Sequence, residues 1–124
     1  MPLIERSELP VAVTPAVFYL QFQHYALPLV KSRLFYLTSS EDAIRYTGAN
    51  SDELNLQFLS RVIPLQVPPY REFISQHPHF LLCADTTNFT WATQKLLDDG
   101  AHLKLLAAQG AYFLFDVDAN AAER

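Results

Sequence analysis

The sequence predicts a three-layer α/β fold in which a mostly parallel, Rossmann-like sheet is covered by helices on both faces. The first observation is the run 79–85 (HFLLCAD), which is apolar almost throughout rather than alternating and is therefore typical of a strand buried on both faces. The second is the alternation of short apolar runs with segments of helical spacing. The third is the pair of runs 102–107 and 111–117, which must form an antiparallel hairpin because no crossover helix fits between them.

A threonine-proline pair marks the first turn from strand to helix. The apolar run 9–13 stops at Thr14-Pro15, and threonine at an N-cap followed by proline at the first helical position is a strong helix start. Aromatic residues at helical spacing continue to about Tyr25, so we expect the helix to end there.

The second strand, 33–38, leads into a short helix. Ser39 and Asp42 have the spacing of a capping box, and acidic residues in a first helical turn interact favourably with the helix dipole. Gly48 is typical of the residue that follows a last helical turn, so we expect the helix to end before it.

Prolines define the next elements. A helix over about 51–63 stops at a proline, and the third strand, 65–67, is kept short by Pro68-Pro69. A small helix over 70–76 then precedes the buried strand.

The helix expected over about 89–99 follows the buried strand, with Trp91, Leu96 and Leu97 as core candidates, and Gly100 ends it. Right-handed crossovers restrict the strand order strongly. We expect the order 3-2-1-4-5-6, with the last strand antiparallel at one edge.

Composition indicates one α/β domain, 1–124, with frayed tails at 1–8 and 119–124. The net charge of −4 and the lack of a basic stripe argue against a nucleic-acid partner. The single cysteine, Cys83, is predicted to be a small buried hydrophobe.

No apolar run approaches the ~20 residues that span a bilayer, and residues 1–10 lack the apolar region of a signal peptide. An extracytoplasmic protein would then be a piece of a longer chain.

The ligand crevice of such a sheet lies at the carboxyl ends of strands 1 and 4, where the strand order reverses. Thr14, Asp85, Thr86 and Asn88 are expected to meet there, near two helix N-termini, as a site for a small sugar or phosphate. The alternative is that Thr14 and Asn88 or Thr87 only cap helices, and that Asp85 only interacts with a helix dipole.

The chain shows no cofactor motif and no catalytic constellation, so neither a cofactor nor a catalytic residue is predicted. None of its three glycines follows strand 1, which excludes a dinucleotide-binding turn. His77 and His79 are the only close histidine pair and lack a further ligand nearby, so no metal site is expected. Asp98-Asp99 is interpreted as a solvated helix end, and Asp85 as a general base would lack a second catalytic group.

Five stretches have the order and spacing of a known family. They are FYLQFQHYA at 18–26, RLFYL at 33–37, AIRYTG at 43–48, FISQHPHFLL at 73–82 and LLDDGA at 96–101. Together they resemble the soluble C-terminal region of bacterial membrane glycosyltransferases of the GT-C class (ArnT-like and protein-mannosyltransferase-like). The resemblance covers most of the chain, and no single motif carries it.

The resemblance implies a non-catalytic accessory or interaction domain that follows the last transmembrane helix, on the extracytoplasmic (periplasmic) face of the cytoplasmic membrane. The family uses polyprenyl-phosphate-linked sugar donors and carries its catalytic acid in an early loop among the membrane helices. The implied partner is therefore the transmembrane part of the parent chain, and an exposed apolar patch near the N-terminus is expected. The alternative is a stand-alone domain, cytoplasmic in that event, that binds a small sugar or phosphate.

Overall fold

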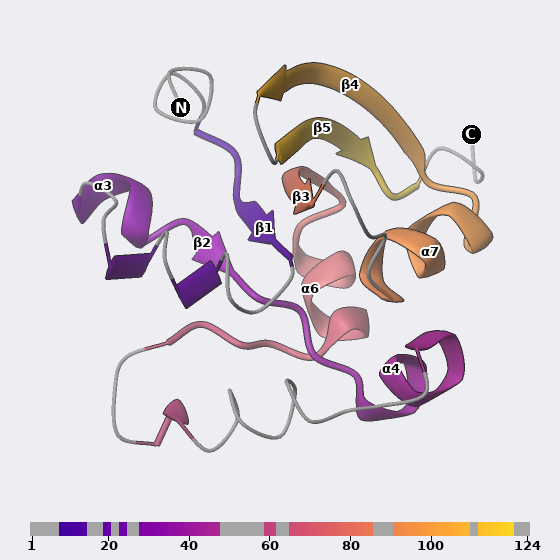
Figure 1. Ribbon diagram of the computed structural model, residues 1–124, viewed down its shortest axis with the longest axis horizontal. Coiled ribbons are helices and arrows are strands. Elements are labelled where there is room, and N and C mark those ends of the chain that lie inside the picture. Colours follow the sequence, from indigo (N-terminus) through magenta and orange to yellow (C-terminus); the bar gives the residue numbers. More distant parts are fainter. Residues whose placement is uncertain are drawn as a thin grey trace.

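A five-stranded mixed sheet with the strand order β2-β1-β3-β5-β4 forms the centre of the computed structural model (Figure 1). The structure describes residues 8–14, 19–20, 23–24, 28–47, 59–61, 65–85, 91–109 and 112–120. The strands are β1 (Val11–Val13), β2 (Leu34–Phe35), β3 (His79–Asp85), β4 (His102–Gln109) and β5 (Tyr112–Asp118). The helices are α3 (Pro28–Lys31), α4 (Ser40–Thr47), α6 (Tyr70–Gln76) and α7 (Trp91–Asp98). The α/β class expected from the sequence is confirmed.

β3 occupies the middle of the sheet, as its continuous apolar sequence predicts. It pairs parallel with β1 and antiparallel with β5. Phe80 and Leu82 are buried on one face of the sheet, and Leu81 and Cys83 are buried on the other. Because both faces of this strand are covered, neither set of alternate positions can be polar.

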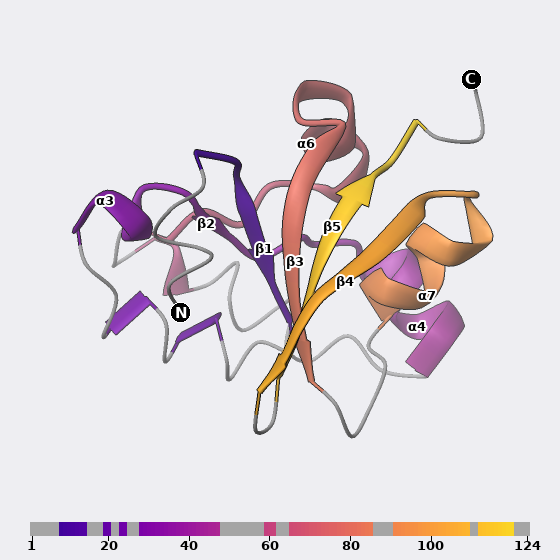
Figure 2. The same ribbon diagram turned by 90° about the horizontal axis from the view of Figure 1, so that it is seen from above.

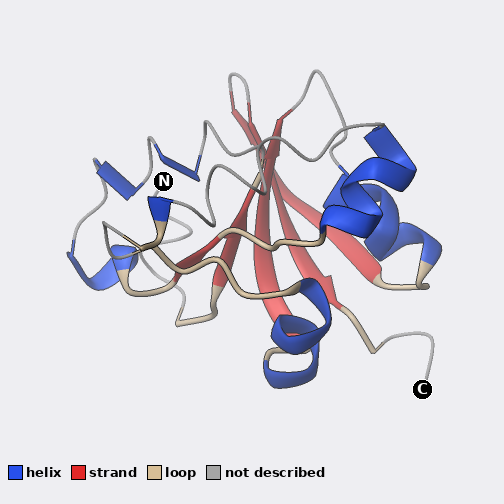
Figure 3. Cartoon of the chain, turned by 90° about the horizontal axis from the view of Figure 1, so that it is seen from below, coloured by secondary structure: helices blue, strands red, loops and turns tan. Residues whose placement is uncertain are grey.

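Two hydrophobic clusters lie on opposite faces of the sheet. The first joins the sheet to α4, α6 and α7 through Ala43, Phe73 and Leu96. The second joins it to Tyr19 and to Val30 of α3. Figure 2 shows α4 and α7 side by side at one end of the fold, with α3 at the other. The strands therefore form the middle layer, with described helical segments around them (Figure 3).

The expected order 3-2-1-4-5-6 is wrong at the closing hairpin. β5 lies between β3 and β4, so the last strand is internal and the one before it is at the edge. Side-chain burial agrees with this placement, since Leu114 and Val117 of β5 are fully buried whereas Lys104 of β4 is exposed. An internal strand loses more water from its faces than an edge strand does, so the more apolar strand is favoured there. The sheet is therefore mixed, with a parallel half and an antiparallel half, rather than Rossmann-like in its order.

The third expected strand, 65–67, is not a strand in the structure. The segment still runs beside the extension of β2, since the Tyr36 amide donates to the Gln66 carbonyl at 3.0 Å and Thr38 forms an isolated parallel bridge with Pro69. Prolines cannot donate a backbone hydrogen bond, which prevents a regular ladder over this segment. β2 is accordingly shorter than the expected 33–38.

The ends of α4 and α7 confirm the sequence signals. The Ser39 hydroxyl accepts from the Asp42 amide at 3.2 Å and donates to the Asp42 carboxylate at 2.8 Å, which closes a capping box. Gly100 has a φ of 83°, a left-handed conformation that glycine adopts without steric cost. The Ala101 amide donates to Leu96 at 2.9 Å, as in a Schellman motif. Leu97, however, is 52% exposed rather than in the core.

Several expectations fall largely outside the described residues. These are the first helix over 15–25, of which only Tyr19–Leu20 and Gln23–His24 are described as helical, the helix over 51–63, and Gly48. At the C-terminus, the Ala119 amide donates to the Pro78 carbonyl at 2.8 Å, which ties the first residue of the expected tail 119–124 to the sheet. None of the described helices is both long and apolar enough to cross a membrane.

Candidate functional site

The crevice expected between the carboxyl ends of two strands begins where β1 and β3 run side by side. Val13 pairs with Cys83, and the Thr14 amide donates to the Cys83 carbonyl at 2.9 Å. Thr14 is only 5% exposed, so its side chain is buried at the end of β1. Asp85 ends β3, but its side chain, Thr86 and Asn88 lie outside what the structure describes. The site of a sugar or phosphate at these four residues stays a prediction.

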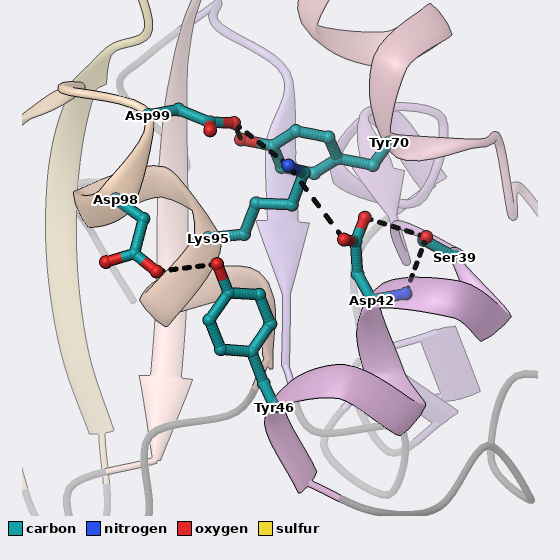
Figure 4. Close-up of polar contacts among 7 residues, drawn as sticks. All are labelled: Ser39, Asp42, Tyr46, Tyr70, Lys95, Asp98 and Asp99. Carbon is teal, nitrogen blue, oxygen red and sulfur yellow. Dashed lines mark hydrogen bonds and ion pairs between the residues drawn. The ribbon is translucent and has the colours of Figure 1, made fainter.

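A second polar site lies where α4, α6 and α7 meet (Figure 4). It was not expected from the sequence as a unit. We call it the inter-helix cluster, and it consists of Ser39, Asp42, Tyr46, Tyr70, Lys95, Asp98 and Asp99. Its members lie in three helices that are far apart in the sequence or directly next to them, so the cluster exists only once the fold has brought those helices together.

Lys95 is at the centre of the inter-helix cluster. Its ammonium nitrogen lies 3.3 Å from the Asp99 carboxylate and 3.9 Å from the Asp42 carboxylate, and 5.3 Å from the centre of the Tyr70 ring. The Lys95 side chain is only 13% exposed. A largely buried ammonium group requires nearby negative charge, and here two carboxylates and an aromatic face supply it.

Two tyrosine hydroxyls connect the neighbouring helices to the end of α7. Tyr46 donates to the Asp98 carboxylate at 2.6 Å, and Tyr70 donates to the Asp99 carboxylate at 3.2 Å. Burial, then the Asp99 carboxylate, raises the pKa of Tyr70 far above its usual value. The hydrogen bond to Asp98 raises the pKa of Tyr46. Both phenols are therefore protonated donors at neutral pH, not bases.

The two adjacent aspartates serve different partners. Both carboxylates are exposed, as expected for a solvated helix end, but each also accepts a hydrogen bond from a different helix. Carboxylates that point to separate partners are not arranged as an acid/base pair. The Lys95–Asp99 contact has the i,i+4 spacing that a sequence can reveal, whereas Tyr46 and Tyr70 carry no local signal of their role.

An open hollow of about 340 Å³ borders the inter-helix cluster. We call it the α4–α6 hollow. It is lined by residues from the segments 38–45 and 69–71 and by Lys95. The hollow lies where α4 and α6 begin. Thr38 is next to both points, because it directly precedes Ser39, the capping residue of α4, and contacts the first residue of α6. The Tyr70 amide donates to the Thr38 carbonyl at 2.9 Å, which holds the start of α6 beside this point.

The remaining candidates lie in the sheet. His79 and Asp116 contact each other across β3 and β5 at 2.7 Å, and the described residues contain no group of three or more potential metal ligands. Cys83 is fully buried, and burial raises the pKa of its thiol to about 12. It is therefore the buried hydrophobe that the sequence predicts and not a nucleophile at neutral pH.

No family model, no curated protein and no solved structure matches the chain. The resemblance to membrane glycosyltransferases therefore supports a proposal and not an identification. The geometry described above is independent of it.

We expect replacement of Lys95 by methionine to lower the free energy of unfolding by about 1 kcal/mol. The change leaves the half-buried Asp42 carboxylate without its cation, while methionine keeps most of the side-chain volume. Urea unfolding measures the effect, with Lys104→Met on the exposed part of β4 as the matched control. Equal stability of the two variants would show that the inter-helix cluster contributes nothing to the packing of α4 on α7.

Proposed function

We propose that the chain is a non-catalytic accessory domain of a bacterial membrane glycosyltransferase that uses a polyprenyl-phosphate-linked sugar donor. Its partner is the transmembrane part of the parent chain, and its place is the extracytoplasmic face of the cytoplasmic membrane. The resemblance of the five sequence stretches names this class of enzyme. The domain would pack on the membrane part and shape the access of the acceptor.

The observation that favours an interaction role is the surface of β4. This strand is last in the sheet order, so one of its backbone edges has no neighbouring strand in the described part of the chain. Leu105 is 52% exposed and Leu106 is 37% exposed. The pairing with β5 shifts between Leu105 and Ala107, which makes Leu106 the extra residue of a β-bulge. Exposed edges with large apolar side chains are unfavourable in water and are typical of surfaces that another chain covers.

This surface lies away from the N-terminus. The apolar patch expected near the N-terminus stays a prediction, because residues 1–7 lie outside the described residues; within those, β1 is buried, and the exposed large apolar residues lie on α4, α7 and β4. The proposal therefore places the contact with the membrane part at β4, defined by Leu105 and Leu106, rather than at the described N-terminal residues.

The first test is to read the gene upstream of Met1 and count apolar segments of about 20 residues. Several such segments in frame are expected. A start codon at Met1 without any of them would contradict the proposal.

The second test labels single cysteines in the full chain in its membrane. Leu106→Cys is expected to react with a maleimide at least about tenfold more slowly in the assembled chain than in the detergent-unfolded chain, because the membrane part covers it. Glu72→Cys on the exposed face of α6 is the matched control and should react at similar rates in both. Both variants carry Cys83→Ala, because Cys83 is buried in the folded domain but becomes reactive once the chain is unfolded. Equal protection of both positions, or of neither, would argue against a contact at β4.

A further inference from the structure

Most polar side chains around the α4–α6 hollow already have partners within the fold. The Thr38 hydroxyl contacts the carbonyls of Val67 and Pro68 at 3.3 and 3.1 Å. Asp42 is held by Ser39 and by Lys95, at 2.8 and 3.9 Å. These groups form fixed walls that are electrically close to neutral, and they have little capacity left for a ligand.

Three charged side chains of the hollow are not used in this way. Arg45, Arg71 and Glu41 line it, are exposed, and form no ion pair within 4.0 Å with any described residue. Arg45 is nevertheless positioned, since its guanidinium lies 5.1 Å from the centre of the Tyr46 ring. Tyr46 is itself held by Asp98 through its 2.6 Å hydrogen bond. The open side of the hollow thus presents two guanidinium groups and one carboxylate.

We propose that Arg45 and Arg71 bind the oxyanion of a small polar ligand, a phosphate or a carboxylate, in the α4–α6 hollow. Guanidinium groups present paired N–H donors that match both kinds of oxyanion, and such charge-assisted hydrogen bonds are about twice as strong as neutral ones. A volume of about 340 Å³ is at the small end of the range of ligand pockets, which fits a compact molecule. Glu41 disfavours a second anionic group and can accept a hydrogen bond from a ligand hydroxyl.

The net charge of the chain means that an anion can be held only by contacts at short range. With a net charge of −4, the protein as a whole does not attract anions. Binding must therefore come from the two arginines at short range, and it should weaken with added salt over the distances at which exposed charges are screened. This inference does not rest on the proposed function, because the hollow lies on α4 and α6 and the proposed contact with a membrane part lies on β4.

The test is an NMR titration of the ¹⁵N-labelled protein at low salt, with inorganic phosphate and with acetate as separate probes. The expected result is saturable shifts confined to the amides of 38–45 and of Tyr70 and Arg71, and at least about tenfold weaker binding in the double variant Arg45→Gln/Arg71→Gln. Arg61→Gln/Lys104→Gln, which removes the same two positive charges from exposed positions outside the hollow, is the matched control and should bind like the parent. Glu41→Gln should bind more tightly, by about two- to threefold, because it removes a repelling charge.

Both probes have an informative outcome. Stronger binding of phosphate favours a phosphorylated ligand, and stronger binding of acetate, despite its smaller charge, favours a carboxylate. Shifts scattered over the surface, or equal weakening by Arg61→Gln/Lys104→Gln and by Arg45→Gln/Arg71→Gln, would mean general ion screening and would overturn the proposal. So would the absence of saturable shifts with either probe, provided that the parent spectrum shows a folded protein.

Discussion

Replacement of Leu96 by alanine is expected to lower the free energy of unfolding by about 3 kcal/mol, whereas the same replacement at Leu97 should change it by less than about 0.5 kcal/mol. Leu96 is 0% exposed and belongs to the cluster that joins α7 to the sheet. Its truncation removes apolar contact and leaves a cavity, and both effects destabilise the folded state. Leu97 is 52% exposed, so its side chain loses little when it is shortened.

The pair is a matched experiment, because the two residues are identical, adjacent and in the same helix. Differences in helix propensity cancel, since leucine is replaced by alanine in both variants. Urea unfolding of the two variants and the parent gives the values. A loss at Leu97 as large as that at Leu96 would mean that α7 is rotated relative to the arrangement described here, with both leucines in contact with the sheet.

These two leucines also show what the sequence could predict. A helix of two or three turns that packs on a sheet buries the residues along one of its faces. The pattern from Trp91 to Leu97 is compatible with a buried face that includes Leu97 and with one that leaves it exposed. The sequence therefore predicted the helix, its glycine terminus and Leu96 in the core. It could not fix the rotation of the helix, which depends on the contact between α7 and α4.

The strand order shows a similar limit. The continuous run 79–85 identified the central strand correctly. Consecutive residues of a strand point to opposite faces of the sheet, so a strand that is buried on both faces has consecutive apolar residues. A hairpin can attach to a sheet through either of its strands, and local pattern does not distinguish the two. The two strands differ in burial only once the sheet is formed, since β5 buries Leu114 and Val117 whereas β4 exposes Leu105 and Leu106.

The polar sites divide in the same way. The Ser39–Asp42 capping box is a contact between neighbours in sequence, and its spacing predicted it. The contacts Tyr46–Asp98 and Tyr70–Asp99 join residues 52 and 29 positions apart, so only the folded chain could reveal them. The α4–α6 hollow depends on both kinds of contact, which is why the sequence pointed to the strand ends and not to it.

A fully buried thiol makes the stability of the domain sensitive to alkaline pH. Burial raises the pKa of Cys83 in the folded state from its usual value of 9.0 to about 12. Below pH 9 both states are protonated and the group has no effect on the pH dependence. Between pH 9 and 12 the unfolded chain releases a proton that the folded chain retains, so the free energy of unfolding falls by roughly 1 kcal/mol for each pH unit.

The Cys83→Ala variant should lose this dependence, even though its smaller side chain also lowers stability at every pH. Urea unfolding at several values between pH 8.5 and 10 measures the slope for the parent and the variant, and the comparison of slopes separates ionisation from packing. The window stops at pH 10 because Tyr19 and Tyr70, whose pKa values burial also raises, would add slopes of the same sign above it.

In native buffer at pH 8, the thiol should also react with a disulfide reagent about a thousandfold more slowly than in urea, since the thiolate fraction falls tenfold for each unit of pKa. Equal slopes in parent and variant, together with rapid labelling of the native protein, would mean that β3 is accessible to water at Cys83 and that the sheet is not covered on that face.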